Sequence, residues 1–227
     1  MHETPIKSRI FRLKVWGENA CFTRPEMKVE RVSYDVMTPS AARGVLEAIL
    51  WKPAIRWRVS QIDVLKPIRW ESVRRNEVGT VMSTDLALTA MKRGSGQLGL
   101  YVEDERQQRA GLFLRDVAYT IYAYFELADR AGPEDNMTKF EQMFFRRAEK
   151  GQCFHRPYLG CREFSAHFAL IAQGEPLPQP IPFSTDLGWM LHDQDYCGEI
   201  PEARFFRARL EDGRMKVPSL EAQEVRA

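Results

Sequence analysis

The sequence predicts an α+β fold, in which a ferredoxin-like N-terminal domain with a β-hairpin insertion precedes a small antiparallel β subdomain. The hydrophobic patterns up to residue 171 run strand, helix, strand, strand, insertion, strand, helix and strand. This order is close to the β-α-β-β-α-β arrangement of the RNA-recognition form of the ferredoxin-like fold. A proline-rich stretch, EPLPQPIP (175–182), then reads as a linker. We therefore expect one domain over residues 1–174, and a linker with its subdomain over residues 175–227.

The first half of the chain supplies a strand, a long connection and a helix. Residues 6–16, IKSRIFRLKVW, alternate apolar and basic side chains as a strand does. Residues 17–38 form a long polar connection, and long loops in compact domains are usually binding elements or disordered. The clearest helix covers residues 39–50, PSAARGVLEAIL, where Thr38 can cap the start and Pro53 lies just beyond the end.

The remaining elements follow from composition and turn signals. A β-rich run of aromatic and branched residues and a second amphipathic helix are the strongest of them. The predicted elements are two strands within 55–78 bent at Pro67, an insertion or extended hairpin at 79–111, a strand at 112–127, a helix at 136–150, a strand at 157–171, and short strands at 183–220 with a turn at Asp212-Gly213.

The composition is that of a soluble globular protein, with 44% hydrophobic and 28% charged residues. The N-terminal segment is polar, and no stretch reaches the roughly 18 consecutive apolar residues of a membrane span. We expect a cytoplasmic protein with no membrane partner.

The net charge of +2 hides two basic blocks. Residues 7–75 hold 15 Lys and Arg against 7 Asp and Glu, and residues 139–162 hold 6 against 2. Two distant basic segments separated by an acidic middle are typical of a polyanion-binding face. The alternative is a solvated surface with uneven charge.

The stretch GQCFHRPYLGCREF (151–164) raises three alternatives: a metal site, a Cys/His nucleophile or a phosphate-binding segment. The spacing of Cys153 and Cys161 fits no common zinc site, and nothing nearby completes a nucleophile with an oxyanion hole. We expect no metal and no cofactor. His155 and Arg156 follow a basic helix and suit phosphate handling, with a structural histidine as the alternative. The cysteines are expected to be reduced thiols: Cys21, Cys153, Cys161 and Cys197.

The predicted second helix carries three cations on one face, Lys139, Arg146 and Lys150. Lys139 lies near the helix N-terminus, where backbone N–H groups and the helix dipole favour an anion. It is suited to anchor a phosphate or to stabilise charge on a transferring phosphoryl group. The alternative is an exposed face with solvated lysines.

Two stretches resemble a known family: GENACFTRPEMKVERVSYDVMTPSAARGVLEAILWKPAIRW and FEQMFFRRAEKGQCFHRPYLGCREF. The chain is similar, from about residue 8 to residue 215, to the type I-C CRISPR-associated subunit of the RAMP superfamily. The resemblance implies an endoribonuclease that cleaves CRISPR repeat RNA without metal, with the 2′-hydroxyl as nucleophile. It also implies that the protein stays on the 5′ handle of the crRNA, contacts the Cascade backbone and large subunits, and binds double-stranded DNA non-specifically.

The family's catalytic tyrosine, lysine and histidine fall on Leu50, Lys139 and Phe140, so only Lys139 matches. RNA transesterification needs in-line geometry, charge stabilisation and a proton carrier. Lys139 is expected to supply the second, and His155 or Tyr34 the third. The leucine and phenylalanine favour an alternative, a non-catalytic subunit that only caps the 5′ handle. An unrelated ferredoxin-like RNA-binding module is a third possibility.

The expected RNA contacts come from the long connection, the second strand and the region of the second helix. They are Arg24, Lys28, Arg31, Arg56, Arg58, Arg146, Arg147 and Arg156.

Overall fold

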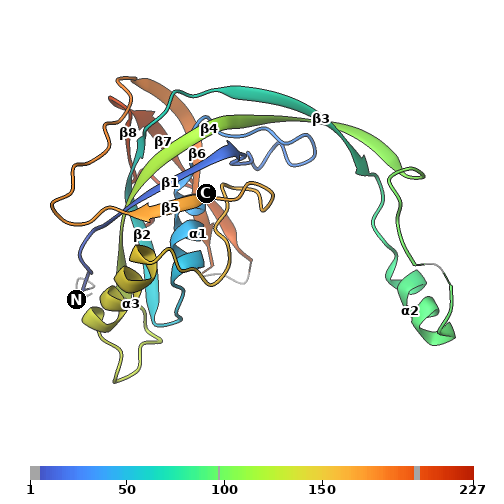
Figure 1. The fold of residues 1–227 in the computed structure, drawn as a ribbon, viewed down its shortest axis with the longest axis horizontal. Helices are drawn as coiled ribbons and strands as arrows, with labels where there is room; N and C mark the ends of the chain where they lie inside the picture. The colour runs from blue at the N-terminus through green and yellow to red at the C-terminus, as the bar shows by residue number, and fades with distance from the viewer. Residues whose placement is uncertain (1–5, 97, 197–199) are drawn as a thin grey trace.

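The computed structural model describes residues 6–96, 98–196 and 200–227. Figure 1 shows a body of strands and helices from which one long β-hairpin projects, with a short helix at its tip. The elements are β1 (Phe11–Ala20), α1 (Pro39–Ile49), β2 (Ile55–Val64), β3 (Trp70–Val78), α2 (Thr84–Arg93), β4 (Arg106–Leu127), α3 (Met137–Glu149), β5 (His167–Leu170), β6 (Thr185–Asp195), β7 (Glu202–Leu210) and β8 (Arg214–Lys216). The predicted α+β class is confirmed.

One antiparallel sheet organises the body. Among the residues described, it has six strands, ordered β5-β1-β4-β2-β8, with β3 paired to β4 off this path. The strand β4 is 22 residues long, and it pairs with β2 over one half and with β3 over the other, while β1 runs along its middle. β6 and β7 form a separate two-stranded antiparallel sheet. The position of β4 therefore sets the register of most of the body.

The hydrophobic core lies on one face of the main sheet. Leu13 and Val15 of β1 are fully buried there, whereas the residues between them belong to the opposite face because side chains alternate along a strand. α1 adds a buried stripe that includes Leu46 and Ile49. α3 adds Phe140, Phe144 and Ala148 to the same cluster. Both long helices thus cover the inner face.

An aromatic group forms the centre of this core. The Phe144 ring lies 4.8 Å from that of Phe11 and 4.7 Å from that of Trp57. The Trp57 ring is also 5.2 Å from that of Phe125, and its indole N–H donates to the Leu50 carbonyl oxygen at 2.9 Å. Ring contacts in this way join strands β1, β2 and β4 to α3, and the Trp57 hydrogen bond joins β2 to the end of α1.

Both predicted long helices are confirmed, and a polar side chain caps each. The Thr38 hydroxyl accepts from the backbone N–H of Ala41 at 3.3 Å, and Asn136 Oδ1 accepts from that of Lys139 at 2.9 Å. Each cap satisfies a backbone donor that has no partner within the helix.

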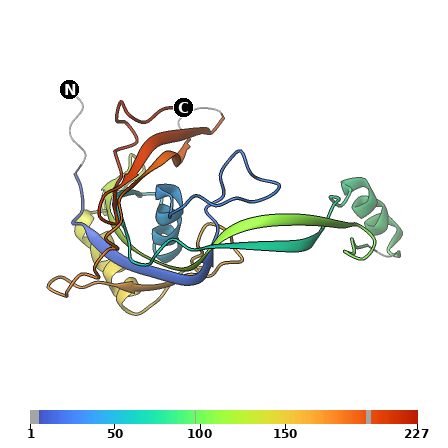
Figure 2. The same cartoon turned by 90° about the horizontal axis from the view of Figure 1, so that it is seen from above.

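The insertion predicted at residues 79–111 proves to be the tip of a long hairpin, here called the arm, made of β3, α2 and the first half of β4. The arm leaves the body as a two-stranded ribbon (Figures 1 and 2). The helix α2 was not predicted, although Ser83 precedes it, Asp85 lies in its first turn and Gly94 ends it in the left-handed conformation. It has no buried residue, so its apolar side chains cover no core.

The root of the arm lies at Asp116. This residue has φ of 52°, a left-handed conformation that is unusual for a non-glycine residue. It lies where β4 changes partner, since Leu114 pairs with Trp70 of β3 and Tyr119 with Val64 of β2. The Lys66 ammonium forms an ion pair with the Asp116 carboxylate at 2.5 Å.

The part of the chain that follows α3 differs from its prediction in two ways. The strand expected over 157–171 is reduced to β5, because residues 157–166 instead form turns and bends with an isolated bridge. The turn at Asp212-Gly213 is confirmed, but β8 beyond it pairs with β2 of the main sheet. Residues 175–182 contain no helix or strand. The boundary between residues 174 and 175 stays a prediction.

The first strand also shifts, from the predicted 6–16 to β1 at 11–20, which shortens the connection that follows it. No helix in the described part of the chain is long and apolar enough to cross a membrane.

Replacing Phe144 by Ala is expected to lower the free energy of unfolding by about 3–5 kcal/mol, because it removes a fully buried ring that contacts Phe11 and Trp57. Chemical denaturation measures the change. Phe154→Ala is the matched control, because that ring is 87% exposed and its loss should change stability by less than about 0.5 kcal/mol. Equal losses in the two variants would contradict the core described above.

Candidate functional site

Lys139 lies in the first turn of α3, at the exposed end of the helix. Its side chain is 45% exposed, and Nζ is 2.9 Å from Oδ1 of Asp135. The Lys139 ammonium holds the pKa of Asp135 below its ordinary value, so the carboxylate is ionised at neutral pH. A cation beside the positive end of a helix dipole forms a site suited to a phosphate.

Leu50 and Phe140, onto which the sequence resemblance maps the family tyrosine and histidine, are core residues. Leu50 is fully buried at the C-terminal end of α1. Phe140 is buried as well, with its ring edge-on to that of Phe125 at 6.4 Å. Neither side chain can exchange a proton, so Lys139 has no titratable neighbour from these two positions.

Tyr34, predicted as a proton carrier, is buried. Only 1% of the residue is exposed, its hydroxyl accepts from the backbone N–H of Leu191 at 3.2 Å, and Arg24 lies over its ring. Burial raises the pKa of the Tyr34 hydroxyl above its ordinary value. These contacts give Tyr34 a structural role, that of joining β6 to the connection after β1, and its catalytic role stays a prediction.

His155, the other predicted proton carrier, lies beyond the opposite end of α3 from Lys139. Ten residues separate Lys139 from the last residue of the helix, which is about 15 Å of helix axis. His155 is exposed, and its ring contacts those of Phe154 and Tyr158. The structure therefore does not bring Lys139, His155 and Tyr34 together.

The predicted RNA-binding cations fall into two groups. Lys28, Arg56, Arg146 and Arg156 are exposed. The other four have protein partners: Arg24 pairs with Asp35, Arg31 with Glu163, Arg58 with Glu126 and Glu221, and Arg147 donates to the Ile49 carbonyl oxygen. No ion pair in the described part of the chain involves the exposed four, so they are better suited to phosphates than the four that already have protein partners.

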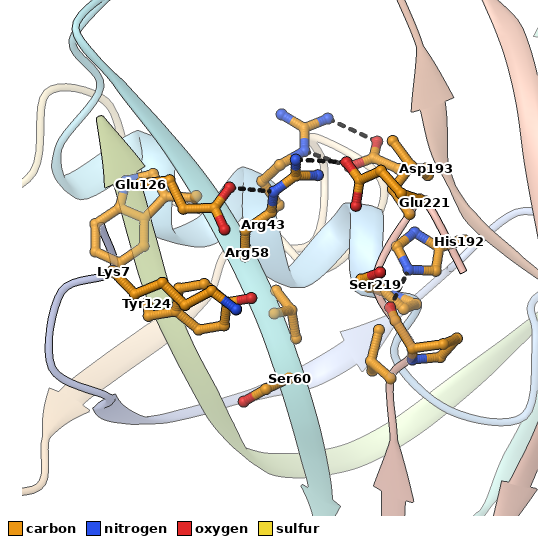
Figure 3. Close-up of a pocket in the computed structure, with 16 residues that line it drawn as sticks. Lys7, Arg43, Arg58, Ser60, Tyr124, Glu126, His192, Asp193, Ser219 and Glu221 are labelled. Carbon is orange, nitrogen blue, oxygen red and sulfur yellow. Dashed lines mark hydrogen bonds and ion pairs between the residues drawn. The ribbon is translucent and has the colours of Figure 1, made fainter. Parts of the chain in front are cut away.

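Arg58 lies in a cavity of about 410 Å³ between the main sheet, α1 and β6, drawn in Figure 3. Its side chain is 17% exposed and reaches Glu126 at 3.1 Å and Glu221 at 2.7 Å. Arg43, on the other side, is held by Asp193 at 2.6 Å (Figure 3). Glu47 of the same helix also pairs with it, at 2.8 Å. The Arg43–Asp193 pair joins α1 to β6, and the pairs of Arg58 join β2 to β4 and to the C-terminal segment.

The cysteines lie in two places. Cys153 packs against the core, while Cys161 Sγ is 3.6 Å from the Cys21 carbonyl oxygen. A hydrogen bond with Cys21 lowers the pKa of the Cys161 thiol, and Arg31 adds to the effect. Cys197 lies outside the described residues. In the described part of the chain, no group of three or more His, Cys, Asp or Glu side chains could hold a metal ion.

The structure also shows a basic and aromatic group of which only Arg156 was among the predicted RNA contacts. Lys14 and Trp16 of β1, His167 of β5 and Arg156 form a contiguous row on the outer face of the main sheet. The alternation of basic and apolar residues in the first strand was the only signal for it, because the pairing of β1 with β5 is not visible in the sequence.

Comparison with known proteins identifies the family. Residues 10–218 match the model of the CRISPR-associated Cas5 proteins, in its Cas5d form. The chain belongs to the Cas5 family. Among its relatives is the CRISPR pre-crRNA endoribonuclease Cas5d of Mannheimia succiniciproducens, 57% identical over 221 residues, which are 95% of this chain and 97% of that protein. The Thermus thermophilus protein of the same name is 42% identical over 235 residues, with coverage of 94% and 93%. The resemblance to the type I-C subunit is thereby confirmed.

Two solved structures share the Cas5 fold of this chain. One is a crystal structure of a CRISPR-associated protein, with a TM-score of 0.71. The other is the functionally uncharacterized protein SMU1763c from Streptococcus mutans, with a TM-score of 0.68. Each is 22% identical to this chain and covers 99% of it, and all of the other chain is covered in turn.

Arg58→Ala is expected to lower the free energy of unfolding by about 1–3 kcal/mol, because it leaves the largely buried carboxylate of Glu126 without its charged partner. Arg56→Ala, two residues away on the same strand, removes an exposed side chain and should change stability by less than about 0.5 kcal/mol. Urea denaturation of both variants gives the comparison. A loss for Arg56→Ala as large as that for Arg58→Ala would refute the structural role of Arg58.

Proposed function

We propose that this Cas5 protein is a pre-crRNA endoribonuclease, and that the scissile phosphate binds at the N-terminal end of α3. The observation that carries the proposal is Lys139, a partly exposed ammonium group at a helix N-terminus. One of its three N–H donors bonds to Asp135, and an ammonium group can bond to a phosphate as well. Two relatives named as pre-crRNA endoribonucleases are 57% and 42% identical over nearly the whole chain, which supports the same activity here.

The proposed reaction is a transesterification. The 2′-hydroxyl oxygen attacks the adjacent phosphorus, its proton passes to a base, and the bond to the 5′-oxygen breaks as that oxygen gains a proton. The products are a 2′,3′-cyclic phosphate and a 5′-hydroxyl. Lys139 stabilises the charge that develops on the non-bridging oxygens, and the N-terminal amides of α3 add to the field.

Within this proposal, His155 contacts RNA beside Arg156 instead of transferring the proton at the phosphate held by Lys139. Its place beyond the far end of α3 supports this assignment. Asp135 is the ionised group beside Lys139, and it positions the ammonium.

We also propose that the body is a ferredoxin-like domain. The strand order β5-β1-β4-β2, with α1 between β1 and β2 and α3 between β4 and β5 along the chain, supports this assignment. The arm is then an insertion between the second and third strands of that pattern.

The partners we propose are the CRISPR repeat RNA, the 5′ handle of the crRNA, the Cascade backbone and large subunits and, without sequence preference, double-stranded DNA. The protein would act in the cytoplasm. The exposed cations Lys28, Arg56, Arg146 and Arg156 suit the nucleic acids.

A non-catalytic subunit that only caps the 5′ handle is the second candidate. It is favoured by one observation, the burial of Leu50 and Phe140, onto which the sequence resemblance maps the family tyrosine and histidine.

Lys139→Ala is expected to slow cleavage of a cognate repeat RNA by at least about 100-fold, because it removes the cation that stabilises the transition state. Single-turnover assays in excess EDTA measure the rate and detect the cyclic phosphate. The RNA affinity of the variant should stay within a few-fold of wild type. Lys150→Ala, at the other end of α3, is the matched control and should cleave normally. Wild-type binding without any cleavage would favour the handle-capping candidate, and full activity of Lys139→Ala would exclude Lys139 from catalysis.

RNA affinity should fall steeply as salt rises, since bound phosphates release their counterions. Removing one phosphate contact with Arg146→Ala should reduce the slope of log affinity against log salt by about 0.7 to 0.9. Arg209→Ala, an exposed arginine of β7 outside the predicted surface, should leave the slope unchanged. Filter-binding titrations over a range of salt give these slopes, and identical slopes for wild type and Arg146→Ala would remove Arg146 from the interface.

A further inference from the structure

The outer face of the main sheet carries a row of flat and cationic groups at its β1–β5 edge. Lys14 and Trp16 lie on the face opposite to the buried Leu13 and Val15. Antiparallel pairing sets Trp16 directly across from His167 of β5. The row is therefore fixed by backbone register, and it faces away from both long helices.

The members of the row contact one another in sequence. The Lys14 ammonium lies 5.4 Å from the centre of the Trp16 ring. The Trp16 and His167 rings are nearly parallel, 5.7 Å apart with an interplanar angle of 19°. The Arg156 guanidinium is 3.3 Å from His167 Nδ1. Cation, indole and imidazole thus follow one another, and the guanidinium is hydrogen-bonded to the edge of the imidazole.

One end of the row is accessible to solvent. His167 and Arg156 are exposed, and Trp16 is half-buried, so the row is open to a ligand at the edge strand. Its cations also differ from those of the cavity around Arg58, because no ion pair in the described part of the chain involves Lys14 or Arg156. The row is both flat and positively charged.

Flat rings beside unneutralised cations suit one kind of ligand best. Unpaired bases stack on aromatic side chains and on guanidinium planes, while the neighbouring cations attract the phosphates. A paired A-form helix offers no free base faces, because its bases stack on each other. A peptide could use the cations but would make less use of the stacked rings.

We propose that Lys14, Trp16, His167 and Arg156 form a stacking platform for unpaired bases of a single-stranded RNA segment. The proposal rests on the proposed function, since it concerns the RNA that the protein processes. Arg156 follows His155 in the segment after α3, so the platform extends the RNA-binding surface from that segment onto the sheet. It lies apart from Lys139 and has no part in bond cleavage.

The test compares two short, unstructured, fluorescently labelled RNA oligonucleotides of equal length, one with bases and one abasic. Fluorescence anisotropy with the full-length protein gives both affinities. Trp16→Ala should weaken binding of the RNA with bases by about 5- to 100-fold and leave binding of the abasic strand nearly unchanged. His167→Ala, at an exposed position, should act in the same direction, and Trp16→Phe should restore much of the affinity.

Trp189→Ala is the matched control. This tryptophan of β6 is 46% exposed and has Arg226 5.8 Å from its ring, so it presents a similar pair outside the platform. Its replacement should change neither affinity. Thermal unfolding of each variant checks that the fold persists, and His167→Ala carries the test if Trp16→Ala does not fold.

Three outcomes are separable. If wild type binds and cleaves repeat RNA but Trp16→Ala and His167→Ala bind the RNA with bases as well as wild type does, the platform is refuted and the proposed function stands. If equal RNA affinity is accompanied by lost assembly with co-expressed Cascade subunits, the row is a protein contact, which also overturns the proposal. If wild type neither binds nor cleaves repeat RNA, the proposed function itself fails.

Discussion

The backbone ladder of β4 is the constraint on which the rest of the structure depends. This single strand pairs with β1, β2 and β3, so one register aligns the inner-face residues for the helices and the outer-face residues for solvent. A slip of one residue would move every inward side chain to the outside. The aromatic group around Phe144 and Trp57 holds that register by packing, since it contacts β1, β2 and β4 at once. The core, the outer row and the root of the arm all follow from it.

Local signals were enough to predict the elements that are stabilised locally. A capping residue and the apolar stripe after it define each long helix, with Thr38 before α1 and Asn136 before α3. The turn at Asp212-Gly213 depends on two residues in the left-handed conformation. Elements that depend on distant partners were harder to predict from the sequence. The strand β8 pairs with β2, which lies about 150 residues earlier in the chain. The helix α2 has no buried residue, so it lacks the buried apolar stripe by which a helix is usually predicted.

The site shows the same division in terms of charge and burial. Lys139 could be placed at a helix start from sequence alone, because the cap and the stripe fix that end of α3. The burial of Tyr34 could not be predicted, because the β6–β7 hairpin that covers it begins some 150 residues later in the chain. Arg58 looked like a surface cation for the same reason: Glu126 and Glu221, which neutralise it, are brought to it only by folding. Residue type predicts the chemistry that is possible, and tertiary contacts decide which cations remain available.

The left-handed Asp116 gives the molecule a mechanical property. β1 and the connection after it still pair with β4 as far as Leu112, and farther out the sheet is a ribbon of β3 and β4, of which β3 spans about 30 Å. The arm is attached to the body at one end only, so a force on its tip acts as a torque on β4, the central strand of the body. At this point the backbone of Asp116 is left-handed, and an exposed ion pair joins its carboxylate to Lys66. Because dissolved ions screen such a pair, we expect this attachment of the arm to weaken as ionic strength rises.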